Sequence, residues 1–447
     1  MPEYQEDIKR FIDETCKKAK IPGLAAVVIR NNKTSYYTYG MADIKKGIRV
    51  DECTLFEIGS LSKAFTTMAI FRLKNMGLIS LDDKVSKYIN GFYLLHNKKR
   101  YDCTIFDLVY HRTGIPFEQV HQIRPGGEDD ALKSNCERLV GLESKFIPGS
   151  DYMYSSCNID LLAYIIECIN SIKFEDYIYE NILTPLGLKN TYLFRSDAAK
   201  THKLSQGYRY TMLNPRRYDT EIIRGNTPAA FIISSISDME RWLKINMKII
   251  FISSEFTKII DEMCGVQYRI DNDNLLGAGW NINNDGVLWF RGNNPNFQSA
   301  IMFDQESKIG VCVLTNICTS TIYYIIENIL KIPKYAFIPA YKDSPFKKLD
   351  EIFTIVDFIL ILLIVIFAVK FWIEKSIIKI SLLNTGMWLC SFSVINYMIH
   401  IMPNILADYK NISWKVIKIW ASKSIYYFRY LINILLLLLL LGCIFEI

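Results

Sequence analysis

The C-terminal quarter of the chain is dominated by three long apolar runs, and these restrict its fold more than any other feature. The run 352–369 has one charged residue, Asp357, and further runs cover 380–402 and 425–446. A helix needs about 20 apolar residues to cross a bilayer, and lipid cannot pair a free backbone amide. We therefore expect a membrane region, 341–447, with transmembrane helices at 352–372, 380–402 and 425–446. Hydrophobic dimerisation or core helices are the alternative.

The rest of the chain, 1–340, has the composition of a globular domain. Half of the 447 residues are hydrophobic and the mean hydropathy is +0.12, an excess that is concentrated in the apolar runs. The net charge is +6, and much of it lies beside these runs, which favours a lipid bilayer as a partner and argues against nucleic acid.

The charge pattern leaves the orientation in the membrane open. The N-terminal stretch 1–29 is charged and lacks the apolar core of a signal peptide. Lysines are most frequent before the first run and between the second and third runs, so the positive-inside rule would place the globular domain in the cytoplasm.

The cysteines give no sign of a metal site or a disulfide framework. The chain has 11 cysteines, with no C-x-x-C pair and no Cys/His cluster. We therefore expect free, buried thiols and no metal or other cofactor.

The pattern of apolar residues predicts a mixed α/β (α+β) domain. A helix is expected at 5–19, followed by a hairpin of strands 24–30 and 34–40. Strands are expected again at 277–281, 287–291, 299–303 and 309–315, and a closing helix at 321–330. Both ends of the domain would build one antiparallel β-sheet flanked by helices, with the mostly helical middle, 105–265, as an inserted subdomain.

Ser60 and Lys63 stand three residues apart at the start of a predicted helix. Residues at this spacing share one helix face, so the lysine amine can reach the serine hydroxyl. A serine needs a neighbouring base to act as a nucleophile, and burial can lower the pKa of a lysine enough for that role. The bare tetrapeptide is a weak signal, because an ordinary amphipathic helix can contain it.

Several nearby polar residues have more than one open interpretation. Glu57, one turn before Ser60, is a partner for Lys63, a site for a substrate amine, or half of a structural ion pair. His111 is a turn residue or a catalyst. Asn293, Asn294 and Asn296 either form a turn or contact a polar substrate.

Six segments in order make the chain resemble the serine β-lactamase and penicillin-binding-protein superfamily, in its class C-like branch. They include TLFEIGSLSKAFTTMAI around Ser60, TIFDLVYHRTGIP at 104–116 and PGSDYMYSSCNIDLLAYIIE at 148–167. The resemblance covers about residues 5–335. The three apolar runs also resemble the membrane region of colibactin-type prodrug peptidases. Such catalytic domains usually face outside, opposite to what the charge pattern predicts.

The resemblance implies a role for particular residues. Ser60 would be the acylated nucleophile, Lys63 its general base and Tyr154 the residue that passes a proton to the leaving group, with a lowered phenol pKa. Ser156 occupies the position of the family's substrate-binding asparagine, and Asn158 could substitute for it.

The third family motif falls on Phe290, Arg291 and Gly292. The glycine is kept and would let the strand approach the substrate closely. The cation is replaced by Phe290, while Arg291 would point to the other face of the strand. The oxyanion hole would combine the Ser60 N–H with a backbone N–H near Ser299 or in the loop of the 290s.

Together these features predict a membrane-anchored serine hydrolase. Its expected substrates are small molecules or peptides, cleaved as a peptidase, amidase or esterase at D-amino-acid-containing or acylated peptides. The alternative is a catalytically weak, penicillin-binding-like sensor that signals through the membrane helices, in a multi-pass protein of the cell membrane.

Overall fold

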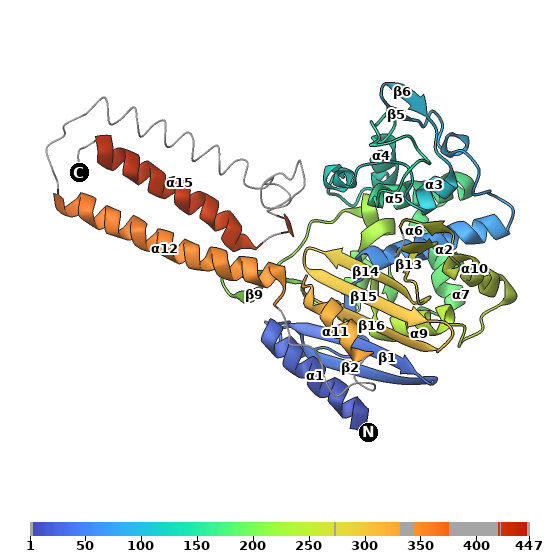
Figure 1. Ribbon diagram of the computed structural model, residues 1–447, viewed down its shortest axis with the longest axis horizontal. Helices are drawn as coiled ribbons and strands as arrows, with labels where there is room; N and C mark the ends of the chain where they lie inside the picture. Colours follow the sequence, from blue (N-terminus) through green and yellow to red (C-terminus); the bar gives the residue numbers. More distant parts are fainter. Residues whose placement is uncertain (1–2, 272–273, 331–342, 375–418, 421, 445–447) are drawn as a thin grey trace. The chain divides into compact units, whose positions relative to one another are not determined.

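The computed structural model describes residues 3–271, 274–330, 343–374, 419–420 and 422–444 (Figure 1). The chain divides into two compact units: one holds residues 1–208 and 218–341, and the other holds 209–217 and 342–447. The C-terminal division falls between residues 341 and 342, and the short segment 209–217 groups with the second unit.

The first unit is built on a nine-stranded sheet in the order β11-β12-β13-β14-β15-β16-β1-β2-β3. All of its neighbouring strands pair antiparallel. The bounds are β1 (Gly23–Arg30), β2 (Lys33–Asp43), β3 (Ile48–Arg49), β11 (Tyr268–Arg269), β12 (Leu275–Gly277), β13 (Trp280–Ile282), β14 (Leu288–Asn294), β15 (Phe297–Asp304) and β16 (Ile309–Thr315).

The two ends of the domain meet in the middle of this sheet, as the sequence predicts. β1 pairs with β2 through a turn in which Asn31 and Asn32 have positive φ, and it pairs with β16 with Leu24 opposite Thr315. β1 has no polar side chain before Arg30, and residues Gly23–Ile29 are all buried, so both faces of the strand are covered.

Helices cover both faces of the sheet (Figure 1). α1 (Glu3–Ala19) contacts β2, α11 (Thr321–Ile329) contacts β15 and β16, and the two helices touch each other. α9 (Ile236–Asn246) packs on β1 and β16. It joins α2 (Ser62–Asn75) through Trp242, which stacks on Phe65 with ring centroids 4.1 Å apart.

Between β3 and β11 the regular structure of the first unit is mostly helical, and it also includes two small sheets. These are β4-β10-β7 and β5-β6. Their strands are β4 (Leu55–Glu57), β5 (Leu94–His96), β6 (Lys99–Tyr101), β7 (Thr191–Tyr192) and β10 (Ile233–Ser235). The helices are α3 (Ile105–Val109), α4 (Ala131–Glu137), α5 (Ser156–Asn170), α6 (Phe174–Ile178), α7 (Thr184–Leu186), α8 (Arg195–Lys200) and α10 (Ser254–Cys264).

One expected strand is wrong. Residues 277–281 do not form a continuous strand, because β12 ends at Gly277 and β13 begins at Trp280. Gly279 turns the chain between them with φ +79°, and a Cβ there would lie 3.1 Å from the Ala64 Cα of α2. The turn thus needs both the backbone freedom and the small size of glycine.

The second unit contains α12 (Pro345–Glu374), α15 (Lys423–Ile444) and the hairpin segment between β8 (Tyr208–Thr211) and β9 (Asn214–Arg217). α12 and α15 pack against each other. Within the described residues, one helix is long and apolar enough to cross a membrane, Pro345–Lys370 of α12. The expectation of three spans is therefore supported for one helix only, and the expected span 380–402 lies outside the described residues.

A buried carboxylate organises the second unit. Asp350 of α12 accepts hydrogen bonds from the backbone N–H groups of Met212 and Leu213, at 3.2 and 2.8 Å. It also accepts from the hydroxyls of Ser422 and Ser424. Met212 and Leu213 both have positive φ, a backbone conformation that residues other than glycine seldom adopt. The carboxylate therefore holds an uncommon turn in place.

Candidate active site

Ser60 lies where the strand β4 runs into the helix α2. A single tight turn, Gly59–Leu61, joins them, and Gly59 has φ +54°. A Cβ on Gly59 would lie 2.6 Å from the backbone nitrogen of Asn293. Glycine is therefore required on both steric and conformational grounds, and the turn brings Ser60 against the end of β14.

The three predicted catalytic residues lie together. Lys63 Nζ is 3.0 Å from Ser60 Oγ, and the Tyr154 hydroxyl donates to the same oxygen at 2.8 Å. Lys63 Nζ also lies 5.0 Å from the centre of the Tyr154 ring. Tyr154 reaches Ser60 from the segment just before α5, so residues 94 positions apart meet on one hydroxyl.

Burial shifts the pKa values of Lys63 and Tyr154 in opposite directions. Removal from water lowers the pKa of Lys63 to about 7, although the negative charge of Asp160 opposes this shift. The same burial raises the pKa of Tyr154, and this effect outweighs its hydrogen bonds to Ser60 and Ser156. The expected lowering of the phenol pKa is thus wrong for this state: the phenol keeps its proton.

A backbone carbonyl completes the surroundings of Lys63. Its Nζ donates to the Ala229 oxygen at 2.8 Å. Ala229 belongs to a π-helical turn, Thr227–Phe231, which also packs against α5. The sequence pattern does not reveal this partner, because a main-chain oxygen has no residue signature.

The second predicted segment is held by a buried polar chain. Thr113 Oγ1 donates to Asn158 Oδ1 at 2.7 Å, and Asn158 Nδ2 lies 3.2 Å from His111 Nδ1. The His111 ring lies 4.8 Å from that of Tyr154, and burial lowers the pKa of His111 to about 3. His111 is therefore a neutral neighbour of Tyr154. Asn158 is fully buried and uses its amide inside the protein. Ser156 lies within hydrogen-bond reach of the Tyr154 hydroxyl.

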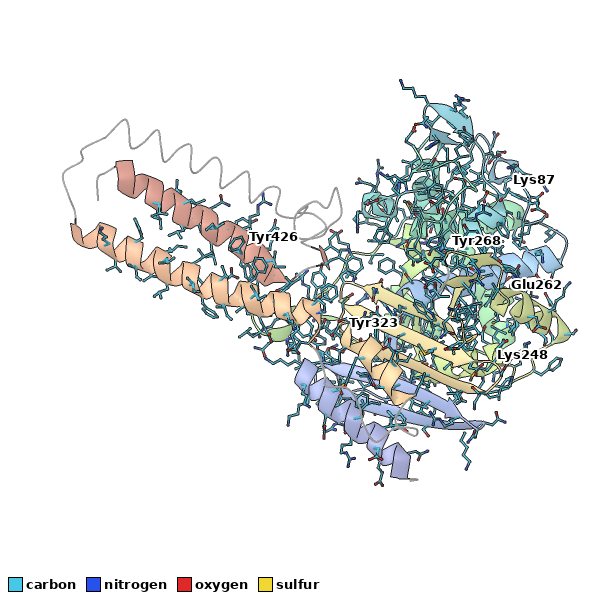
Figure 2. All side chains as sticks on the ribbon, viewed as in Figure 1. Lys87, Lys248, Glu262, Tyr268, Tyr323 and Tyr426 are labelled. Atoms are coloured by element: carbon cyan, nitrogen blue, oxygen red, sulfur yellow. The ribbon has the colours of Figure 1, made fainter. Side chains whose placement is uncertain are left out.

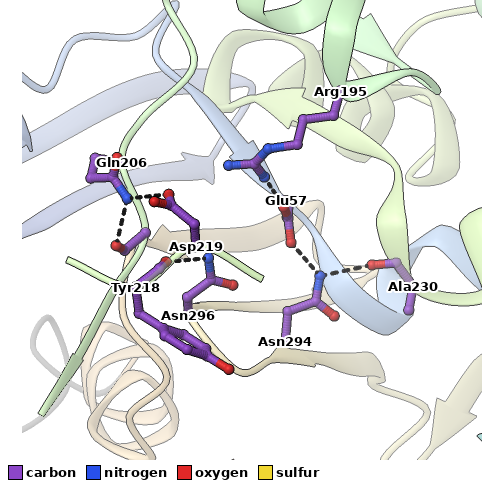
Figure 3. A network of polar contacts seen from close by, with 9 residues as sticks. Glu57, Arg195, Gln206, Tyr218, Asp219, Ala230, Asn294 and Asn296 are labelled. Carbon is purple, nitrogen blue, oxygen red and sulfur yellow. Dashed lines mark hydrogen bonds and ion pairs between the residues drawn. The ribbon is translucent and has the colours of Figure 1, made fainter. Parts of the chain in front are cut away.

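Glu57 and Asn294 form a buried polar network with Arg195 (Figure 3). The Arg195 guanidinium pairs with Glu57, whose side chain is 3% exposed. Asn294 Nδ2 donates to Glu57 Oε2 at 2.7 Å and to the Ala230 oxygen at 3.0 Å. Glu57 therefore pairs with Arg195 and not with Lys63, and Arg195 is a partner that the sequence analysis missed.

Gly292 and Ser299 bring β14 and β15 close to the chain that leads into Ser60. A Cβ on Gly292 would lie 2.1 Å from the Ile58 oxygen. Ser299 is fully buried and donates to that same oxygen at 2.6 Å. The close approach that requires Gly292 is thus made to Ile58, and it places the Asn293 backbone nitrogen beside Gly59.

Phe290 lines a small cavity of about 30 Å³ together with Lys63 and Tyr154. Among the described residues that line the cavity, Lys63 and His111 are the two that can be cationic. Because burial lowers the pKa of His111 to about 3, only Lys63 of these two can carry a positive charge near neutral pH. Arg291 is exposed, lies over the Tyr323 ring of α11 and pairs with Glu327 at 3.6 Å. It faces away from the cavity, as strand alternation predicts. Tyr323 is labelled in Figure 2.

Comparison with known proteins agrees with this geometry. The family model for beta-lactamase matches residues 8–321, more than half of the chain. The chain belongs to the beta-lactamase family. Within the described residues of this beta-lactamase-family protein, no group of three or more His, Cys, Asp or Glu side chains is placed to hold a metal ion.

Three similar proteins illustrate the family relationship of this beta-lactamase-family protein. Protein flp of Staphylococcus aureus (strain MRSA252) is 27% identical over 438 residues, covering 94% of this chain and 86% of the relative. The beta-lactamase of Escherichia coli (strain K12) is 27% identical over 307 residues, 64% of this chain and 74% of the relative. The octameric penicillin-binding protein homologue from Pyrococcus abyssi has a TM-score of 0.64 at 25% identity, covering 78% of this chain and 81% of that chain.

Proposed function

We propose that this beta-lactamase-family protein is a membrane-anchored serine hydrolase that forms an acyl-enzyme on Ser60. One observation carries the proposal: the Ser60 hydroxyl lies within 3.0 Å of the Lys63 amine and 2.8 Å of the Tyr154 hydroxyl. A nucleophile within reach of both a base and an acid is the arrangement that acyl transfer requires.

The proton path follows from the two pKa shifts. Neutral Lys63 takes the proton of Ser60 as its oxygen attacks the carbonyl carbon. The N–H groups of Ser60 and Asn293 stabilise the resulting oxyanion. Tyr154, which keeps its proton, gives it to the leaving group and regains one from protonated Lys63. Water then cleaves the acyl-enzyme and restores Ser60.

The substrate class is an ester or amide in a D-amino-acid-containing or acylated peptide. The family assignment supports a small-molecule or peptide substrate in general. Phe290 narrows it, because the cavity beside Lys63 offers an apolar ring where a substrate carboxylate would need a cation. Substrates without a carboxylate at that position fit the cavity best.

α12 supplies the membrane anchor of this proposal, through its apolar stretch Pro345–Lys370. Protease treatment of intact cells, with lysed cells as the control, tests which side the catalytic domain faces. Cleavage of the domain in intact cells supports an outward domain, and cleavage only after lysis supports a cytoplasmic one.

A fluorophosphonate probe tests the proposed function directly, because it reacts with activated serines without any knowledge of the substrate. We expect labelling of the full-length protein at Ser60, its loss in Ser60→Ala, and its retention in Ser150→Ala, which removes an exposed serine near Tyr154. Equal labelling of the wild type and Ser60→Ala would refute the nucleophile.

The second candidate is a sensor with weak catalysis. Two observations favour it: Phe290 replaces the expected cation, and Ser156 replaces the expected asparagine. A well-folded protein that reacts with neither a fluorophosphonate nor a fluorescent penicillin would support the sensor and exclude the hydrolase.

A further inference from the structure

Asp160 is a buried carboxylate close to the proposed site. It lies in α5 and is fully buried. Asn135 of α4 donates to its Oδ2 at 2.9 Å. Asn226 Nδ2 lies 3.0 Å from Oδ2 and 3.3 Å from Oδ1, in the amide orientation that pairs donors with acceptors. The carboxylate thus accepts from two side-chain amides, each from a different segment.

Asn226 directly precedes the turn Thr227–Phe231 that faces the proposed catalytic helix. Three successive carbonyls of this turn accept hydrogen bonds from side chains of the site, at 2.8, 2.8 and 3.0 Å. The pairs are Thr66 with Pro228, Lys63 with Ala229, and Asn294 with Ala230. The position of the turn therefore decides where the Lys63 amine is held.

Gly225 provides a second attachment for the same turn. The Asn135 amide that reaches Asp160 also donates to the Gly225 oxygen at 2.8 Å. A Cβ on Gly225 would lie 2.7 Å from the Ala131 oxygen of α4. Two adjacent residues, Gly225 and Asn226, are thus tied to Asp160, one directly and the other through Asn135.

We infer that Asp160 is a positioning residue for the proposed hydrolase. Its carboxylate fixes the turn 227–231, so that the Ala229 carbonyl directs the Lys63 amine toward Ser60. The inference rests on the proposed function and adds to it a residue that does not touch Ser60. A displaced base costs rate steeply, about a hundredfold for 1 Å.

Asp160 also acts on Lys63 by its charge. Four ionisable groups interact with it across the packed elements, namely Lys63, Arg138, Cys136 and Cys157. Burial raises the pKa of Asp160 itself well above its usual value, and Lys63, the Asn135 hydrogen bond and Arg138 act against that rise. In its ionised form the carboxylate raises the pKa of Lys63 against the effect of burial. Loss of the charge in Asp160→Asn should therefore move the acid limb of the pH–rate profile to lower pH, which a merely structural residue would not do.

A swap of donor and acceptor tests the positioning role. Asp160→Asn alone keeps an acceptor, because its amide oxygen in the place of Oδ2 can still accept from Asn135 and Asn226. Asp160→Leu removes both acceptor oxygens, and Asn226→Asp places two carboxylates together. We expect Asp160→Leu and Asn226→Asp each to react with the fluorophosphonate at least about tenfold more slowly than the wild type. The double variant D160N/N226D restores one donor opposite one acceptor and should recover to within about threefold.

Controls separate this inference from the proposed function. Asp238→Asn removes another buried carboxylate, bound by Asn190 and Thr191, and should lower the melting temperature without slowing the labelling. Wild-type labelling that depends on Ser60, together with unchanged rates in D160L and N226D, would overturn the inference and leave the proposed function intact. Labelling independent of Ser60 would overturn the function itself. If D160L does not fold, Asn226→Ala carries the same expectation of slower labelling.

Discussion

The Tyr154 hydroxyl donates to Ser60 Oγ at 2.8 Å, and burial raises the pKa of this phenol. Tyr154 thus begins the reaction as an acid, and Lys63, with its pKa lowered to about 7, is the base. The two residues have separate roles because burial penalises the charged form of each: the lysine loses its proton more easily and the tyrosine less easily.

Tyr154→Phe should slow the cleavage of poor leaving groups most. General acid catalysis contributes about 10²–10⁴-fold, and a nitrophenolate leaves without needing a proton. We expect the kcat/KM for an alkyl ester or amide to fall by about a hundredfold, and that for a p-nitrophenyl ester much less. An equal loss on both substrates would contradict the role of Tyr154 as the acid.

The pH profile should report Lys63. Because the base must be neutral and burial lowers its pKa to about 7, kcat/KM should rise with pH through about 7 and then level off. Measurements of p-nitrophenyl ester hydrolysis from about pH 5 to pH 9 test this. Lys63→Arg, which stays protonated throughout, should abolish the rise, and a flat wild-type profile would contradict the assignment.

Phe290→Lys should improve reaction with substrates that carry a carboxylate. The new ammonium would face the cavity beside Lys63 and Tyr154. We expect acylation by a fluorescent penicillin to become about tenfold faster, the gain of about 1.4 kcal/mol typical of one charge-assisted contact. Arg291→Lys is the matched control, because the exposed Arg291 side chain faces away from the cavity. Unchanged penicillin reactivity would show that the ring does not decide carboxylate recognition.

Arg195→Met should destabilise the catalytic domain. It would leave the Glu57 carboxylate buried beside Asn294 without its ion pair. Breaking one side of such a pair costs on the order of 3 kcal/mol. Lys200→Met breaks an exposed pair with Asp197 and should cost less than about 1 kcal/mol. Urea unfolding of the two variants compares these values, and similar losses would refute the structural importance of Arg195.

Asp350→Asn should loosen the hairpin segment 209–217. The variant loses a carboxylate that accepts from two backbone N–H groups and two serine hydroxyls. Without it, the turn at Met212 and Leu213 should become a site of limited proteolysis. Glu351→Gln, which alters a partly exposed partner of Lys347, should leave the digestion pattern unchanged. Cleavage at the same rate in both variants would rule out the hairpin restraint.

Local sequence was enough for much of the fold. The Asn31-Asn32 turn between two apolar strands predicted the β1–β2 hairpin, and the spacing of Ser60 and Lys63 predicted their contact within one helical turn. Such features depend on neighbours a few residues apart, whose periodicity the sequence shows directly. The break at Gly279 was missed, because the need for it lies in α2, far away along the chain.

By itself, then, the sequence determined which segments are apolar, where strands and helices form, and which serine, lysine and tyrosine are candidates for chemistry. Only the tertiary structure decided their surroundings. The Ala229 carbonyl accepts from Lys63, and Arg195 pairs with Glu57. The Asn158 amide contacts Thr113 and His111. Each of these contacts joins residues between 45 and 166 positions apart, and burial, which sets the pKa of each group, arises only when such distant segments pack together.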